Sequence, residues 1–232
     1  MGDKKVRLQK FIASTSIVSR RTAEDLIVAG RVYVNGTQVM KLGTSIDPHI
    51  DHVRVNGKDL VPVTTFRYIA VNKPEGVTCT HAQYKNERTI YDIIPGIRDL
   101  AIAGRLDKDS GGLLLLTNDG ELVNQVTHPR YEHEKEYEFS TSRPLDEDAC
   151  NALTQGVKLN EGYARFDTFT VVGPVTYRVV IHQGWKRQIR RMVGTVRGDL
   201  TRLTRVRINT LELGSLQPGE WREVKQSDIL AG

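Results

Sequence analysis

The chain has 232 residues, enough to bury a sizeable core in one or two domains. Lysine and arginine number 33 against 28 aspartates and glutamates, giving a formal charge of +5 that fits a nucleic-acid partner without identifying one. No apolar run reaches the roughly 18 residues that a membrane span needs, and the N-terminus lacks the apolar core of a signal peptide.

Cysteine and histidine residues give no metal-site pattern. Cys79 and Cys150 lack a CxxC spacing, and two cysteines alone do not close a structural zinc site. The spacing of His128, His133 and His182 also matches no common zinc site. We therefore expect ordinary thiols and histidines in a reducing, cytoplasmic compartment, and no bound metal.

The first sixty residues predict two short helices followed by two hairpins. The second helix is expected to begin near Ser19 and to end at Gly30. Two valine-rich runs, 32–34 and 53–55, each lead into an Asn-Gly pair that favours a tight hairpin turn. Apolar residues at helical spacing mark the inner faces of the two helices: Leu8, Phe11 and Ile12, then Ala23, Leu26 and Ile27.

Arg20 and Arg21 lie where the second helix is expected to begin. Cations near a helix N-terminus oppose the helix dipole, at a cost of about 0.3–1 kcal/mol each. A phosphate docked there would neutralise both arginines and accept hydrogen bonds from the first backbone N–H groups. A solvated charged face is the competing interpretation, because surface charge runs are common.

Pro62 and the polar pair at 64–65 mark the predicted join between two domains, residues 1–62 and 63–232. Beyond it, strands and helices alternate without the regular rhythm of a parallel sheet. We predict strands over 68–71, 113–116 and 177–181, a helix capped by Asp119, and a helix over 186–192. Alternation over 203–208 places Arg205 and Arg207 on one strand face. The fold class is therefore α+β, with a mostly antiparallel mixed sheet flanked by helices.

The run from Gly104 to Gly112 carries two carboxylates in a glycine-rich loop, directly before the apolar strand 113–116. Catalytic groups commonly occupy loops that rigid strands hold. A purely local turn explains the same residue types, because aspartate, glycine and serine all favour turns. Spacing alone leaves both interpretations open.

Four stretches resemble, in the same order, the motifs of the S4-domain-containing ribosomal RNA pseudouridine synthases. Gly104–Gly112 reads Gly-Arg-Leu-Asp-x-Asp-Ser-x-Gly, and the likeness continues through the strand to Gly120. Asn72–Val77 is similar to the family's Asn-Lys-Pro turn, and Glu134–Tyr137 to its Lys-x-Tyr strand. Gln183–Met192 resembles its Arg-Gln-Ile-Arg-Arg-Met block. The N-terminal helices and hairpins likewise resemble an S4 RNA-binding domain.

The resemblance implies a catalytic role for three residues. Asp107 would be the nucleophile, Arg190 would hold its carboxylate ionised, and Tyr137 would stack on the uracil and help to move a proton. Asp109 is interpreted as a hydrogen-bond acceptor that fixes the loop. Without the resemblance, the simpler interpretation of Tyr137 is a strand residue that packs in the core. Whether Asp107 attacks ribose C1′ or uracil C6, or triggers elimination, is left open by the sequence.

The substrate implied is an RNA nucleotide that is unpaired or extruded from its helix. The basic run 187–191 has a competing interpretation as a solvated helix face. The residues predicted to contact RNA are Arg20, Arg21, Lys73, Arg105, Lys135, Arg187, Gln188 and Arg191.

The family's reaction needs no cofactor or metal, and we expect a monomer that acts on a ribosomal RNA stem-loop. Gln183-Gly184 stands where many relatives carry Glu-Gly, and this departure favours a large-subunit RNA substrate. A transfer-RNA or dual substrate is an alternative. So is a non-catalytic RNA-binding or ribosome-assembly factor on the same scaffold, although a pure binder has no need for Asp107, Tyr137 and Arg190 together. A hydrolytic glycosidase is a weaker hypothesis, since it lacks a second carboxylate.

Overall fold

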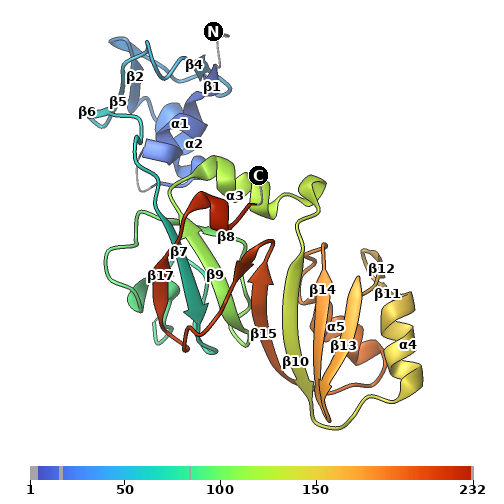
Figure 1. Ribbon diagram of the computed structural model, residues 1–232. Helices are drawn as coiled ribbons and strands as arrows, with labels where there is room; N and C mark the ends of the chain where they lie inside the picture. Colours follow the sequence, from blue (N-terminus) through green and yellow to red (C-terminus); the bar gives the residue numbers. More distant parts are fainter. Residues whose placement is uncertain (1–4, 16–17, 84, 231–232) are drawn as a thin grey trace. The chain divides into compact units, whose positions relative to one another are not determined.

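The computed structural model describes residues 5–15, 18–83 and 85–230, and the chain divides into two compact units, residues 1–66 and 67–232 (Figure 1). The join that the sequence predicts after Pro62 lies four residues before this division. The elements of the first unit are β1 (Val6–Arg7), α1 (Leu8–Thr15), α2 (Arg20–Val28), β2 (Val32–Val34), β3 (Thr37–Gln38), β4 (Ser45–Ile46), β5 (Val53–Val55) and β6 (Lys58–Leu60).

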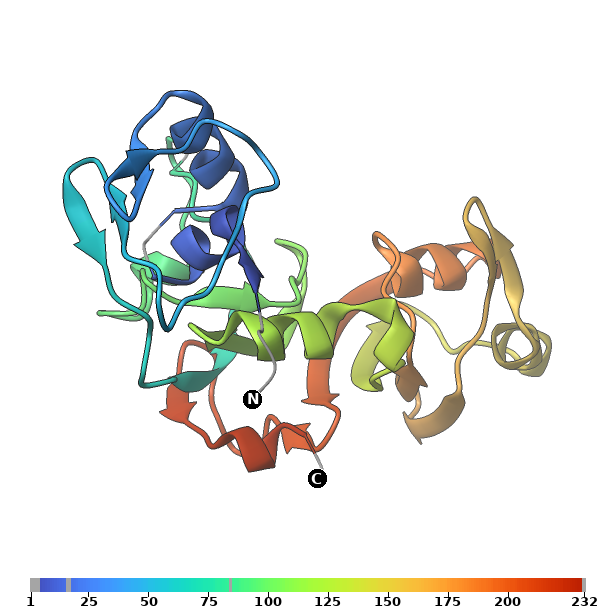
Figure 2. The ribbon, with the colours of Figure 1, turned by 90° about the horizontal axis from the view of Figure 1, so that it is seen from above.

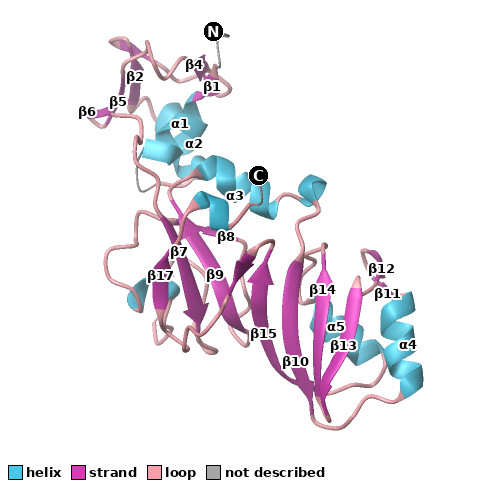
Figure 3. Cartoon of the chain, viewed as in Figure 1, coloured by secondary structure: helices cyan, strands magenta, loops and turns pink. Residues whose placement is uncertain are grey.

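The second unit is built mainly of strands (Figure 3). Its helices are η1 (Ile90–Asp92), α3 (Gly120–Thr127), η2 (Pro129–Tyr131), α4 (Glu147–Gln155), α5 (Gln188–Thr195) and η3 (Gln226–Asp228). Its strands are β7 (Tyr68–Lys73), β8 (Ala101–Ala103), β9 (Gly111–Thr117), β10 (Lys135–Thr141), β11 (Val157–Leu159), β12 (Gly162–Ala164), β13 (Thr168–Gly173), β14 (Thr176–Ile181), β15 (Leu200–Ile208), β16 (Leu211–Glu212) and β17 (Trp221–Glu223).

In the first unit, two helices pack on a small antiparallel sheet with the order β3-β2-β5-β6. The Ser19 side chain accepts a hydrogen bond from the Thr22 backbone N–H at 3.1 Å and so begins α2 as predicted. Asn35 and Gly36 both have positive φ, 51° and 80°, which is the backbone of the tight turn that an Asn-Gly pair favours. The predicted helices and hairpins of this unit are confirmed.

Among the described residues, the main sheet of the second unit has nine strands, seven of them in the order β13-β14-β10-β15-β9-β7-β17. β16 pairs with β15, and β8 pairs with β9. β9 and β15 run parallel, whereas β7, β10, β13, β14 and β17 pair with their neighbours in antiparallel fashion. The predicted mostly antiparallel mixed sheet is therefore confirmed, and its parallel junction lies at the centre.

The sheet buries both of its faces where β7 and β9 run. Leu114 and Leu116 pack on one face with residues of α5, and Leu113 and Leu115 pack on the other with residues of α3. Successive strand residues point to opposite faces, so the apolar run 113–116 serves two cores at once. Each fully buried leucine contributes about 1.5–3 kcal/mol of burial free energy. The strand that carries loop 104–110 on its N-terminal side is thus held from both sides.

A β-bulge changes one sequence prediction. Tyr137 pairs with Arg205, but its neighbour Glu136 pairs with Arg207, so Val206 is an extra residue opposite the Glu136–Tyr137 bond. Paired residues share a face, and adjacent residues do not. Arg205 and Arg207 therefore lie on opposite faces, and the prediction that they share one is wrong.

One further local prediction is wrong. Helix α5 begins at Gln188 and not at 186, because Arg187 adopts a left-handed backbone with φ of 52°. At the edge of the sheet, Trp221 lies on strand β17 with 43% of its surface exposed. An edge strand has one neighbour fewer, so fewer side chains cover its residues.

Gly112 permits the close approach of β9 and β15. Its φ is +101°, and an added Cβ would lie 2.6 Å from the backbone nitrogen of Arg205 and closer still to its carbonyl oxygen. Both backbone atoms belong to the neighbouring strand, so they cannot move aside cheaply. A glycine is required here for its conformation and for its lack of a side chain.

We predict that Gly112→Ala lowers the free energy of unfolding of the second unit by about 2–5 kcal/mol, the sum of backbone strain and overpacking. Urea unfolding followed by circular dichroism measures the change. Gly194→Ala is the matched control, because a Cβ at that helical glycine meets no atom within 4 Å and should leave stability equal or raise it. Equal stabilities of the Gly112→Ala variant and the wild type would contradict the close approach.

Candidate active site

Loop 104–110 is held by backbone and side-chain contacts at its start, middle and end. At its start, the Gly104 carbonyl accepts a hydrogen bond from Arg205 Nη2 at 3.3 Å. In its middle, the Lys108 carbonyl accepts one from the Gly76 backbone N–H at 2.7 Å. At its end, Arg190 Nη2 donates to the Asp109 carbonyl and to Ser110 Oγ. Segments distant in sequence thus fix the loop around Asp107.

Asp109 is the acceptor of an arginine pair. Arg187 donates to both of its carboxylate oxygens, at 3.1 and 2.8 Å, and Arg190 Nε lies 3.4 Å from Oδ2. The hydrogen bonds from Arg187, with the charges of both arginines, lower the pKa of Asp109. Asp109 therefore fixes the loop, and its carboxylate lies against both Arg187 and Arg190.

Arg190 does not form the predicted pair with Asp107. Its guanidinium is taken by Asp109 and Ser110 at the end of the loop. Within residues 5–15, 18–83 and 85–230, no side chain hydrogen-bonds or ion-pairs with the half-buried Asp107 carboxylate. The pKa of Arg187 is raised mainly by its hydrogen bond with Asp109, and the negative charge of Asp107 raises it further. Asp107 is thus near cationic groups with its oxygens uncommitted.

Tyr137 and Arg205 form a buried polar pair that the sequence did not indicate. Arg205 has only 2% of its surface exposed and donates from Nε to the Leu113 carbonyl at 2.8 Å. Its Nη1 lies 3.5 Å from the phenol oxygen of Tyr137, which is itself buried. With the bond to Gly104, Arg205 joins β9, β10 and the start of loop 104–110. The only hint in the sequence was a charged residue within an apolar strand pattern. Because the bulge adds a residue to β15, strict alternation does not give the inward direction of the Arg205 side chain.

Comparison with known proteins identifies two families in this chain. The model of the RNA pseudouridylate synthase family matches residues 67–194, and the S4 domain model matches residues 6–49. An uncharacterized RNA pseudouridine synthase of Aquifex aeolicus is 38% identical over 97% of this chain and 92% of its own length. This chain belongs to the RNA pseudouridine synthase family.

Two further relatives support that assignment. The dual-specificity RNA pseudouridine synthase RluF of Escherichia coli K12 is 34% identical over 99% of this chain and 79% of its own length. A crystal structure of a pseudouridylate synthase superposes with a TM-score of 0.70 at 29% identity, covering 97% of this chain and 98% of that one. The fold is therefore an S4 domain joined to a pseudouridine synthase domain.

Two residues of the synthase predicted to contact RNA are buried instead. Lys73 has no exposed surface, and its Nζ donates to the carbonyls of Pro74 and Val77 at 3.0 and 2.8 Å. Gln188 accepts from the Trp185 backbone N–H at 3.1 Å, and its amide nitrogen donates to Gln183 Oε1. Both side chains have partners within the protein, and their contact with RNA stays a prediction. These side chains satisfy backbone and side-chain groups that the turns 73–77 and 183–188 would otherwise leave unpaired.

Lys135 lies on the same strand face as Tyr137, as the alternation of β10 predicts. Its Nζ donates to the His133 carbonyl at 2.9 Å. Burial, with the charge of Arg205, lowers the pKa of Lys135 to about 8. Lys135 is therefore a half-buried amine beside the site, and its contact with an RNA phosphate stays a prediction.

The other predicted RNA-contact residues divide into free and paired cations. Arg20, Arg21 and Arg105 are exposed, and within the described residues none of them has a carboxylate partner. Arg191 instead forms two hydrogen bonds with Glu161, at 2.8 and 3.0 Å. Its role in binding RNA directly is therefore not supported.

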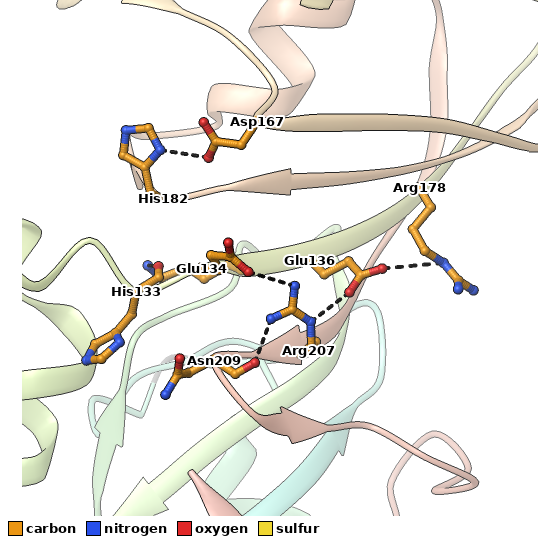
Figure 4. Close-up of polar contacts among 9 residues, drawn as sticks. His133, Glu134, Glu136, Asp167, Arg178, His182, Arg207 and Asn209 are labelled. Carbon is orange, nitrogen blue, oxygen red and sulfur yellow. Dashed lines mark hydrogen bonds and ion pairs between the residues drawn. The ribbon is translucent and has the colours of Figure 1, made fainter. Parts of the chain in front are cut away.

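The opposite side of β10 and β15 carries a separate polar network (Figure 4). Arg207, displaced there by the bulge, hydrogen-bonds Glu136 at 2.7 Å and Glu134 at 3.1 Å. His182 pairs with Asp167 at 2.7 Å.

Among the described residues, no three histidines, cysteines or carboxylates lie close enough together to hold a metal ion. No helix of the described part of the chain is long and apolar enough to cross a membrane.

We predict that Asp109→Ala lowers kcat by about 10–100-fold while RNA affinity changes only a few-fold. The reason is that Arg187 loses its acceptor and Arg190 loses the neighbouring carboxylate, and small misplacements of a catalytic loop are costly to rate. Single-turnover rates and filter binding with the same RNA separate the two effects. Glu138→Ala, which breaks an exposed pair with Arg178, is the matched control and should leave both quantities unchanged. An unaltered rate in Asp109→Ala would show that the arginine pair does not position the loop.

Proposed function

We propose that this RNA pseudouridine synthase converts a uridine in a large-subunit ribosomal RNA stem-loop to pseudouridine, with Asp107 as the nucleophile. One observation carries the assignment of the nucleophile. Of the two carboxylates in loop 104–110, Asp109 is occupied by two arginines, whereas Asp107 has its oxygens uncommitted. A nucleophile needs free lone pairs, and a fixed neighbour that aims it.

The reaction moves one bond and one proton. The N1–C1′ glycosidic bond of uridine breaks, and a C5–C1′ bond forms in its place. The hydrogen on C5 leaves as a proton, and N1 ends with one, so no net oxidation or hydrolysis occurs. Asp107 supplies the electron pair that makes the first step possible, by analogy with the covalent step of retaining glycosidases. Attack at ribose C1′, attack at uracil C6 and elimination all use the same carboxylate.

Tyr137 and Arg205 would form the wall against which the freed uracil turns. Stacking on an aromatic ring contributes about 1–3 kcal/mol per base. The contact with Arg205 fixes the phenol of Tyr137 in a buried place where it can also accept or relay the C5 proton. Arg190 is a positioning residue in this proposal, because it acts on the nucleophile through the loop.

The S4 domain would supply the docking surface. Arg20 and Arg21 are exposed in the first turn of α2, which contains no acidic residue. Two cations beside the first backbone N–H groups of a helix match the chemistry of an RNA phosphate.

The choice of a ribosomal substrate rests on the S4 domain and on the family resemblance at Gln183-Gly184. Ribosomal RNA is a cytoplasmic substrate, and the protein would meet it there as a monomer. The dual-specificity name of the Escherichia coli relative supports a second kind of RNA substrate, and a transfer RNA is the second candidate. Mapping of pseudouridines in ribosomal and transfer RNA from cells lacking the protein would separate the two substrates.

We predict that Asp107→Asn abolishes turnover and leaves RNA affinity within a few-fold of the wild type. The amide has the same shape and no nucleophilic electron pair of comparable strength. Release of tritium from RNA labelled at uracil C5 measures turnover, because that hydrogen is lost in the rearrangement. Substantial tritium release by the Asp107→Asn variant would refute the nucleophile.

We predict that Arg20→Ala with Arg21→Ala weakens RNA binding and reduces the slope of log K against log salt by about 1–2, because two phosphate contacts no longer release counterions. Filter binding at several salt concentrations measures both quantities. The matched control is Arg54→Ala with Lys58→Ala, which removes the same charge from strands β5 and β6 of the same unit. Identical losses in the two double variants would mean that total charge alone, and not the end of α2, binds RNA.

A further inference from the structure

Hairpin 157–164, formed by β11 and β12, pairs with itself and not with the nine-stranded sheet. Lys158 and Tyr163 are directly opposite each other across its two strands, so their side chains share one face. Both are exposed, and 72% of the Tyr163 surface is open to solvent. The other face carries Leu159 and Ala164, which are buried. The hairpin therefore has one face in the core and presents one aromatic ring outward.

The surroundings of Tyr163 are basic. Lys158 is its cross-strand partner, and Arg165 is the first residue after β12, two residues beyond Tyr163. Both cations are exposed, and over the described part of the chain neither has a carboxylate partner. The carboxylate at the hairpin turn, Glu161, is already neutralised by Arg191 at 2.8 and 3.0 Å. We call Lys158, Tyr163 and Arg165 the hairpin platform.

The hairpin platform is fixed to the active site through a short segment. Figures 1 and 2 both show the hairpin beside α5, with which β11 is in contact. The Trp185 ring approaches to 3.5 Å from the Cβ position of Gly162, and Arg187, two residues later, holds Asp109. Two residues span about 7 Å of backbone at most. Hairpin 157–164 and loop 104–110 therefore both contact the short segment 185–187.

We propose that the hairpin platform binds the RNA strand that flanks the target nucleotide. Tyr163 stacks on an unpaired base, while Lys158 and Arg165 contact the phosphates on either side of it. An exposed aromatic ring between unpaired cations is the composition of a surface that binds single-stranded nucleic acid. The platform acts in substrate recognition and not in the chemical step.

The proposal also gives Arg191 a function. Arg191 contributes to RNA binding without touching the RNA, because its pair with Glu161 holds the hairpin against α5 and neutralises the acidic charge beside the platform.

A protein partner fits this surface less well. A protein-binding patch has an apolar centre and few charges, whereas here a single ring is accompanied by one lysine and one arginine side chain.

The test measures KM and kcat of Tyr163→Ala and Tyr163→Phe on the wild-type enzyme's RNA substrate. We expect Tyr163→Ala to raise KM about 5–150-fold, the range for loss of one stacked base, with the loss in KM rather than in kcat. Tyr163→Phe keeps the ring and should stay within about threefold of the wild type. Trp221→Ala removes another exposed ring, on edge strand β17, and should leave KM unchanged.

Lys158→Ala with Arg165→Ala supplies the second readout. We expect this pair to reduce the salt slope of RNA binding by about 1–2. An unchanged KM in Tyr163→Ala, or an equal loss in Tyr163→Phe, would overturn the stacking role, and an unchanged salt slope would overturn the phosphate contacts. Wild-type turnover on the same RNA is measured alongside. Its absence would refute the proposed substrate, whereas its presence with unaltered variants refutes only the platform.

Discussion

The hydrogen bonds between Arg187 and Asp109 are the interaction on which the site depends. They join loop 104–110 to the segment before α5, 78 residues away in sequence, and Arg190 extends the junction to Ser110. Since about half of the Asp109 side chain is exposed, the ion pair contributes no more than about 1 kcal/mol to folding. The ion pair acts by positioning the loop. It occupies the carboxylate of Asp109 and leaves the carboxylate of Asp107 without a side-chain partner among the residues that the structure describes.

Arg205 complements that junction from inside the protein. Its burial is tolerated because its guanidinium donates to the carbonyls of Leu113 and Gly104 and reaches the phenol of Tyr137. The close contact between β9 and β15 at Gly112 brings this guanidinium to the loop. A parallel junction at the centre of an otherwise antiparallel sheet therefore assembles the site, because it sets the strand that carries Arg205 beside the strand that follows the loop.

The sequence was informative about elements and motifs, and less so about the direction of side chains. Asn-Gly turns, the Ser19 cap and the apolar run 113–116 act locally, so their structures follow from short-range rules. Lys73 and Gln188 look like RNA ligands by residue type, yet their neighbours bury them, which only the tertiary structure reveals. Arg205 was missed for a related reason: a single extra residue opposite Tyr137 reverses the face that strict alternation assigns.

A structure of the enzyme with its stem-loop RNA, carrying 5-fluorouridine at the target, tests the central claim most directly. Fluorine replaces the C5 hydrogen that must leave as a proton, so the rearranged nucleotide is retained in the site. The account predicts an extruded pyrimidine nucleotide within about 3.5 Å of an Asp107 carboxylate oxygen, with Asp109 still bound by Arg187. A nucleotide seated against Asp109, with Asp107 turned to solvent, would contradict it.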